Sequence, residues 1–200
     1  MADFLEFHKM ARMSRECIVT EKIDGTNGQI FIGEDGEFLV GSRTRWITPD
    51  NDNQGFARWA YDHKDELIAG LKHGRHFGEW WGQGIQRNYG LKEKRFWLFN
   101  TIRWCPYGQE PKIIPKTHPE NPKEEQKIQE SLPECCGLVP VLYQGIFNSL
   151  EVEKCLLDLL DNGSRAVTGF MKPEGVVIYH VQGNFGMKKT LEGDGHKGQS

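Results

Sequence analysis

Residues 21–28 combine a lysine, short polar side chains and two glycines in an order that suits chemistry on a phosphate group. Lys22 stands at the end of an extended run and directly before a glycine-containing turn, where its amine can be presented to a phosphorus atom. Gly25 and Gly28 can adopt positive φ and let backbone N–H groups approach a ligand. The short polar side chains of Asp24, Thr26 and Asn27 can contact a phosphate, a sugar or the turn itself.

The flanking residues predict two strands joined by a tight turn. Residues 17–20 and 29–32 are both rich in β-branched and aromatic side chains, which favour extended structure. On these residues alone, an ordinary β-hairpin with a solvated lysine explains the pattern as well as a catalytic lysine does. The choice between them depends on residues further along the chain.

Length and composition predict one domain with its own core. The chain has 200 residues, of which 38% are hydrophobic, and a net charge of −3, so any contact with nucleic acid must be local. No apolar run approaches the roughly 20 residues of a membrane span, and the amino terminus does not resemble a signal peptide. Five cysteines without a C-x-x-C pair favour reduced thiols. We therefore expect a cytoplasmic protein with no membrane partner.

The remaining pattern predicts an α+β fold in which antiparallel β-sheets are flanked by helices. Strands without a regular β-α-β alternation favour this class over a doubly wound fold. Apolar residues three and four apart predict one helix over 54–72, and Ser149 and Gly163 predict the start and stop of another. Further strands are expected at 38–42, 76–81, 95–102, 138–145, 174–179 and 185–191. The proline-rich tract at 105–133 predicts a long surface excursion.

Six short motifs, in a fixed order, resemble those of the covalent nucleotidyltransferases, the superfamily of polynucleotide ligases and mRNA capping enzymes. They are Lys-x-Asp-Gly at 22–25, Arg43 after the third strand, Glu79 and Phe99 in two aromatic strands, Glu-Gly-Val-Val at 174–177, and the pair Lys188-Lys189. Taken singly, Phe99 is more often a core residue, and a lone glutamate is usually a surface carboxylate. Their joint order favours the functional interpretation.

The residue five places after Lys22 separates the branches of that superfamily. DNA ligases and capping enzymes generally carry arginine there, whereas relatives of RNA ligase 2 carry Thr-Asn after the glycine, as Thr26-Asn27 does here. The resemblance is therefore to the RNA ligase 2 group, and it implies the nucleotidyltransferase fold of a ligase adenylation domain. Two residues depart from the pattern: Asp24 stands where the RNA ligase 2 prototype has histidine, and Asn100 stands where many ligases have aspartate. Lys188 and Lys189 are adjacent where Lys-x-Lys is expected, so which of them faces the phosphates is left open.

The resemblance implies an ATP-dependent RNA ligase that uses Mg²⁺ or Mn²⁺. In that reaction a lysine attacks ATP to give lysyl-AMP, AMP moves to an RNA 5′-phosphate, and an RNA 3′-hydroxyl displaces it. A protonated amine cannot attack, so we expect cationic neighbours around Lys22, among them Arg43, Lys188 and Lys189. Positioning and electrostatics supply most of the catalysis in such transfers.

The resemblance also implies a role for each site residue. Lys22, Glu174, Lys188 and Lys189 would be catalytic, and Glu174 would bind the metal. Glu79 would contact the ribose hydroxyls, Phe99 would stack on adenine, and the backbone of Glu21 would help to select adenine. The expected nucleotide-binding residues are Glu21, Lys22, Ile23, Asn27, Arg43, Glu79, Phe99, Glu174 and Lys188.

Ligases usually carry a second domain after the last lysine motif, but only eleven residues follow Lys189. We therefore expect residues 1–200 to form a single adenylation domain, without a C-terminal OB-fold or helical domain, and to be monomeric. Two alternative functions are a GTP-using guanylyltransferase of the capping type and a catalytically silent module that binds nucleotide or RNA. Asn27 disfavours the guanylyltransferase. Several of the motifs resemble those of phage-encoded ligases.

Overall fold

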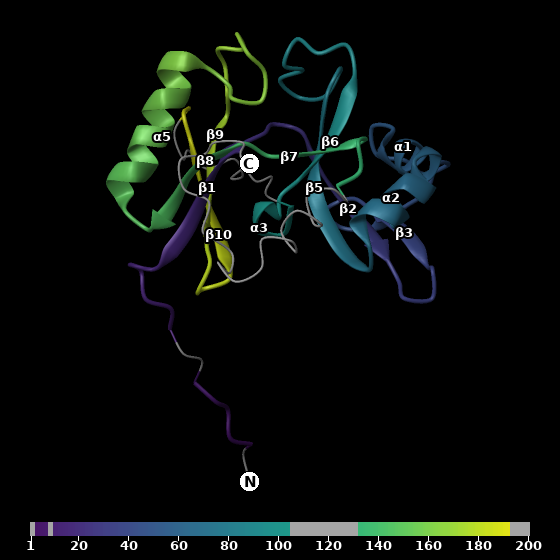
Figure 1. Cartoon of the computed structure of the whole chain (residues 1–200), viewed down its shortest axis with the longest axis horizontal. Coiled ribbons are helices and arrows are strands. Elements are labelled where there is room, and N and C mark those ends of the chain that lie inside the picture. Colours follow the sequence, from purple (N-terminus) through teal and green to yellow (C-terminus); the bar gives the residue numbers. More distant parts are fainter. Residues whose placement is uncertain (1–2, 8–9, 105–131, 193–200) are drawn as a thin grey trace, which may run out of the picture.

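The structure, a computed structural model, describes residues 3–7, 10–104 and 132–192. Two β-sheets lie side by side in the middle of the molecule, with helices α1 and α2 at one end and α5 at the other (Figure 1). Most of the surface excursion predicted at 105–133 falls outside the described residues. In the part of the chain that is described, no helix is long and apolar enough to cross a membrane. The predicted α+β class is confirmed.

The first sheet, sheet A, is antiparallel and has its helix on one face only. Its strands run in the order β10 (Phe185–Thr190), β9 (Gly175–His180), β1 (Glu16–Lys22) and β8 (Val141–Ile146). Helix α5 (Ser149–Asn162) covers one face. The buried core of this half consists of Cys17, Val19, Val152, Cys155, Leu156, Leu159, Val176 and Ile178.

The second sheet, sheet B, has six strands and is mixed, because its last pair, β6–β7, is parallel. The order is β4 (Trp46–Ile47), β3 (Phe38–Gly41), β2 (Thr26–Ile32), β5 (Gly74–Gly82), β6 (Lys94–Leu98) and β7 (Cys136–Leu138). Helices α1 (Phe56–Asp62) and α2 (Lys64–Leu71) pack on one face, and the short helix α3 (Thr101–Trp104) follows β6. An aromatic cluster of Phe56, Trp59, Trp80 and Phe96 fills that interface.

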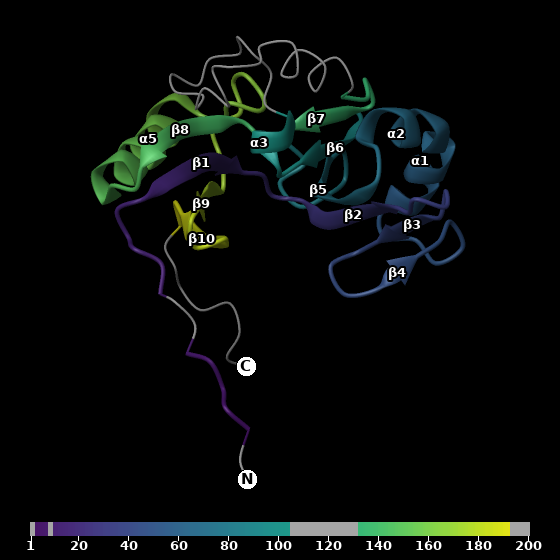
Figure 2. The ribbon, with the colours of Figure 1, turned by 60° about the horizontal axis from the view of Figure 1, so that its bottom comes forward.

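The predicted hairpin around Lys22 does not form, since β1 belongs to sheet A and β2 to sheet B (Figure 2). The chain crosses between the sheets at residues 23–25. It returns at Val139 and Pro140, so the extended segment predicted at 138–145 is two strands in different sheets. The two crossings are adjacent, because the Glu21 N–H donates a hydrogen bond to the Pro140 carbonyl at 2.8 Å. Ile23 and Val139 are both buried in a third apolar cluster at the junction.

The two glycines of the Lys22 motif are needed for their size and not for a positive φ, because neither has one. A β-carbon on Gly25 would lie 2.5 Å from the Trp80 carbonyl oxygen and 2.8 Å from the Trp81 β-carbon. A β-carbon on Gly28 would lie 2.6 Å from the Phe56 ring. The expectation of a left-handed turn was therefore wrong, and the constraint is close packing of β2 against β5 and α1.

Three predicted element boundaries differ from the structure for local reasons. The helix predicted over 54–72 is two helices that meet at His63, whose ring nitrogen bonds the Trp59 carbonyl. The cap of α5 is Asn148 instead of Ser149, because the Asn148 side chain accepts a hydrogen bond from the Leu150 N–H at 2.9 Å. The strand predicted over 95–102 ends at residue 98, after which the chain turns into α3. The predicted stop at Gly163 is confirmed.

Replacing Gly25 by alanine is expected to lower the free energy of unfolding by roughly 1–3 kcal/mol, because the added methyl group overlaps the backbone of β5. Urea denaturation measures this change. Gly186→Ala is the matched control, since a β-carbon there meets nothing closer than 3.9 Å and Gly186 lies in a strand without a positive φ. Equal stability of the two variants would contradict the packing argument.

Candidate active site

Lys22 is the last residue of β1, as predicted, and its amine is paired with a carboxylate. The Lys22 Nζ lies 2.6 Å from an Oε2 of Glu174, and the two side chains are only 22% and 14% exposed. Glu174 is brought there by the register of sheet A, in which Lys22 pairs with Gly175 at the start of β9. The lysine is thus neither solvated nor surrounded only by cations, and an anion is its direct partner.

Glu79 connects the crossing segment to sheet B. One of its oxygens accepts the Gly25 N–H at 3.1 Å, and the other accepts the Asn27 side-chain amide at 3.0 Å. Asn27 and Glu79 are register partners on β2 and β5, which explains why they meet. Burial raises the pKa of Glu79 to about 7; the charge of Lys22 opposes this shift, whereas Glu174 and Asp24 add to it. The Glu79 carboxyl group therefore changes its protonation state near neutral pH.

The Glu21 side chain points to the opposite face of β1 from Lys22. It is buried and accepts hydrogen bonds from the Ser164 hydroxyl at 2.6 Å and from the N–H groups of Arg165 at 2.7 Å and Ala166 at 3.0 Å. Burial raises the pKa of Glu21. This carboxylate fixes the loop after α5 and lies away from Lys22, so its side chain is structural. The expected role of its backbone is untested.

Lys188 and Lys189 point to opposite faces of sheet A. Lys189 is paired through β9 with Val176, which is buried under α5, and its amine forms an ion pair with Glu153 of that helix. Lys188 is paired with Val177, which in turn pairs with Thr20. Because alternate residues of a strand share a face, Lys188 lies on the same face as Lys22.

The other predicted residues occupy different parts of the two sheets. Phe99 follows β6, is 40% exposed, and donates its N–H to the Phe77 carbonyl at 2.9 Å. Arg43 is exposed in the loop after β3. Ile23 is buried among Trp81, Tyr89 and Val139. Among the described residues, Arg43, Phe99 and Lys188 form no hydrogen bond or ion pair with Lys22.

Two residues at the junction, Arg87 and Tyr89, were not predicted as site residues. The Arg87 guanidinium lies 3.0 Å from an Asp24 carboxylate oxygen and 2.9 Å from Glu192, and the Tyr89 hydroxyl accepts the Asp24 N–H at 2.9 Å. Both belong to the loop between β5 and β6, where Gln86, Asn88 and Tyr89 have positive φ. Such conformations are strained for residues other than glycine, so the surrounding contacts must maintain them. The sequence showed only a glycine-containing loop.

Glu174 is the carboxylate best suited to accept a metal ion. Both oxygens of Glu79 accept hydrogen bonds from the protein and Asp24 is paired with Arg87, whereas the described contact of Glu174 uses only its Oε2, which pairs with Lys22. In the described residues, no group of three His, Cys, Asp or Glu side chains forms a ready cage. Mg²⁺ prefers oxygen ligands and retains several waters, so one carboxylate together with phosphate oxygens satisfies it. The residues present therefore fit a divalent cation that binds together with a phosphate ligand.

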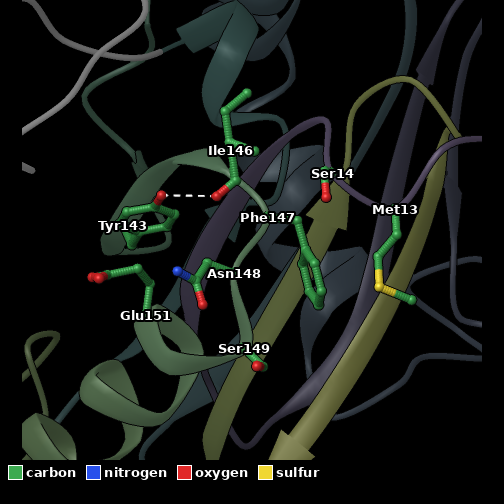
Figure 3. Close-up of a pocket in the computed structure, with 8 residues that line it drawn as sticks. All are labelled: Met13, Ser14, Tyr143, Ile146, Phe147, Asn148, Ser149 and Glu151. Carbon is green, nitrogen blue, oxygen red and sulfur yellow. Dashed lines mark hydrogen bonds between the residues drawn. The ribbon is translucent and has the colours of Figure 1, made fainter.

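A pocket of about 760 Å³ lies elsewhere, where the N-terminal segment passes the start of α5 (Figure 3). Its lining consists of Met13, Ser14, Tyr143, Ile146, Phe147, Asn148, Ser149 and Glu151. The Tyr143 hydroxyl donates to the Ile146 carbonyl within it. None of the predicted site residues lines this pocket, so we do not assign it to the chemistry.

Comparison with known proteins agrees with this geometry. The RNA ligase family matches residues 15–191, and the chain therefore belongs to the RNA ligase family. No curated protein sequence matches it.

Solved structures of a Naegleria gruberi RNA ligase have the same fold. A variant with ATP and Mn is 21% identical to this chain in sequence, with a TM-score of 0.57. The match covers 90% of this chain and 51% of the Naegleria chain. The complex with pyrophosphate is 22% identical with a TM-score of 0.58, at 90% and 50% coverage. A variant with AMP and Mn is 21% identical with a TM-score of 0.58, at 90% and 51% coverage. The chain thus spans about half the length of these ligases.

The buried Glu79 predicts a pH dependence of stability. Its pKa is about 7 in the folded protein and near 4.5 when exposed, so the folded state binds the proton more tightly. The contribution of Glu79 to the free energy of unfolding is therefore lost as the pH rises from about 4.5 to about 7. The slope is no more than about 1.4 kcal/mol per pH unit. Glu79→Gln, which cannot ionise, should lack this component. Urea denaturation of both proteins between about pH 5 and about pH 8 tests this, and parallel stability curves would refute it.

Proposed function

We propose that this chain is the catalytic domain of an ATP-dependent RNA ligase in which Lys22 becomes covalently bound to AMP. The observation that carries the proposal is the position of Lys22 at the junction of the two sheets, in contact with Glu174 and electrostatically coupled to Glu79. Membership of the RNA ligase family supports it. The ATP, AMP, pyrophosphate and Mn complexes of the Naegleria ligase support the choice of nucleotide and metal.

In the first step the Lys22 amine gives up a proton and attacks the α-phosphorus of ATP. A phosphorus–nitrogen bond forms, the bond to the leaving oxygen breaks, and pyrophosphate departs. AMP then passes from Lys22 to the 5′-phosphate of an RNA end. Finally the RNA 3′-hydroxyl attacks that phosphate, the phosphodiester bond forms and AMP leaves. Each step needs the reacting groups in line, and positioning by fixed side chains supplies this.

Glu174 has two functions in this proposal. Its carboxylate, 2.6 Å from the Lys22 Nζ, fixes the amine at the end of β1. It is also the residue that would hold a divalent cation, and that cation would supply positive charge to neutralise the phosphates. Because the ion pair stabilises the charged amine, release from Glu174 must accompany the loss of the proton.

In this proposal Lys188 contacts the phosphates of ATP, whereas Lys189 has a structural role. Lys188 shares a face of sheet A with Lys22, whereas the Lys189 amine is paired with Glu153 on the side covered by α5. A cation on the reacting face stabilises the charge that develops on the α-phosphate and pyrophosphate. A cation on the other face cannot reach them.

The remaining nucleotide contacts follow from exposure and hydrogen-bonding capacity. Phe99 offers an exposed ring on which adenine can stack. Each oxygen of Glu79 accepts one hydrogen bond from the protein and has a second lone pair for a ribose hydroxyl. Asn27 orients Glu79. Arg43 is the exposed cation closest in sequence to the end of β3, and we assign it to the nucleotide as a positively charged contact. Glu21 and Ile23 flank Lys22 at the crossing, and their backbone, since the Ile23 side chain is buried, is the part that would contact the base.

Mixing the purified chain with ATP labelled at the α-phosphate and Mg²⁺ should transfer label to the protein, and Lys22→Ala should abolish it. The reason is that Lys22 ends β1 at the junction of the two sheets, in contact with Glu174. Label transfer is read on a denaturing gel, and intact-mass measurement should show the addition of AMP.

Three controls make this labelling experiment decisive. ATP labelled at the γ-phosphate should transfer nothing, and a metal chelator should prevent transfer. GTP should label the chain far less than ATP; preferential labelling by GTP would instead indicate a guanylyltransferase. A folded wild-type chain that takes no label from either nucleotide would indicate a catalytically silent binding module.

The two adjacent lysines give a matched pair of variants. Lys188→Ala should slow labelling by roughly 10²-fold or more, as loss of one charge-stabilising donor does elsewhere. Lys189→Ala should slow labelling by less than about threefold, because it removes only an exposed ion pair with Glu153. Single-turnover rates of label transfer compare them, and a reversed order would overturn the assignment of faces.

A further inference from the structure

The face of sheet B that carries no helix displays an arginine between a half-buried ring, Phe31, and an exposed one, Trp46. The Arg75 guanidinium carbon lies 4.8 Å from the ring centre of Phe31 and 5.3 Å from that of Trp46. Phe31 and Trp46 are 6.5 Å apart, and Arg75 also donates to the Gln29 side chain at 3.3 Å. Arginine and aromatic planes arranged in this way can stack on further flat, π-rich groups.

The strand register places this cluster on the same face as Glu79. On β2 and β5, the pair Asn27 and Glu79 is followed two residues on by Gln29 and Phe77, and then by Phe31 and Arg75. Alternate residues share a face and lie about 7 Å apart along the strand. A continuous surface therefore leads from Glu79 past Phe77 to Arg75.

Two aromatic side chains on this part of the face, Trp46 and Phe77, are not covered by the protein, whereas Trp81 further along β5 is buried. Trp46 is 43% and Phe77 is 51% exposed, whereas their neighbours on the other face, such as Ile47 and Ile30, are buried under α1 and α2. Arg75 connects the two rings, because it lies two residues from Phe77 on β5 and 5.3 Å from the ring centre of Trp46. Exposed rings linked in this way mark a binding site more often than chance.

The positive charge of this surface favours an anionic ligand. Arg75 lies in the cluster, and Arg43 and Arg45 are exposed in the loop between β3 and β4, although the chain as a whole has a net charge of −3. Cations beside exposed aromatic rings on a β-sheet are the combination that binds single-stranded RNA, with bases on the rings and phosphates near the cations.

We propose that Phe31, Trp46, Arg75 and Phe77, which we call the Trp46 platform, bind single-stranded RNA adjacent to the active site. The platform rests on the proposed ligase function, because it delivers an RNA end to the nucleotide bound at Lys22 and Glu79. Bases stack on Trp46, Phe77 and the Arg75 guanidinium, and the strand runs along β5 toward Glu79. Stacking tolerates any base, so the platform gives the enzyme affinity without sequence preference.

The test measures the affinity of the full chain for a fluorescent single-stranded RNA of about ten nucleotides, without ATP, by anisotropy. Trp46→Ala and Arg75→Ala should each weaken binding roughly tenfold, the usual loss for one stacking residue. Trp46→Phe should retain most of the affinity. Matched controls are Phe185→Ala, which removes a ring of similar exposure (45%) from sheet A, and Arg58→Ala, which removes an exposed cation from α1. Both controls should bind RNA like the wild type.

Several outcomes would overturn the platform. They are wild-type-like affinity of Trp46→Ala and Arg75→Ala, an equal loss in the two controls, or no measurable RNA binding by the wild type. If Trp46→Ala instead lowers the molecular mass in sedimentation without changing RNA affinity, the face is a self-association surface. The labelling of Lys22 by ATP is measured separately, so failure of the ligase proposal and failure of the platform are distinguishable.

Discussion

The structure depends on the passage of the chain from one sheet to the other within three residues after Lys22. The lysine ends β1 in sheet A, and Gly25 is already packed against β5 of sheet B. Glu79 fixes this step by accepting hydrogen bonds from Gly25 and from the Asn27 side chain. The connection between β1 and β2 has only three residues and is packed against β5. It therefore fixes the position of the Lys22 amine relative to sheet B.

Charges around this crossing balance one another only in part. Glu174, Glu79 and Asp24 are carboxylates, whereas Lys22 and Arg87 are the cations that contact or influence them. Burial lets Glu79 reduce the excess negative charge by binding a proton near neutrality. A triphosphate brings more negative charge, so in the proposed reaction Lys188 and a divalent cation must supply the positive charge that the centre lacks.

Local sequence patterns predicted the strands that carry the candidate site better than they predicted the topology. A strand that ends at Lys22, an aromatic strand around Glu79 and a strand after Glu174 each depend on a few neighbouring residues, and all three are present. The separation of β1 and β2 into two sheets could not be predicted, because strand patterns do not specify which strand is the partner. The orientation of Lys189 depends on Glu153 of a helix, and the position of Arg87 depends on a strained loop; both are tertiary effects.

Sheet B is inserted between the first strand of sheet A and the other three, and this order has a consequence for biosynthesis. β1 emerges first from the ribosome, yet its partners in β8 and β9 lie more than a hundred residues later, as the pairing of Glu16 with Ile146 shows. At roughly 5–20 residues per second, translation of the residues between them leaves β1 unpaired for roughly 6 to 26 seconds. The nascent chain must protect an apolar strand during that interval, so the half of the molecule that contains Lys22 is the last to fold.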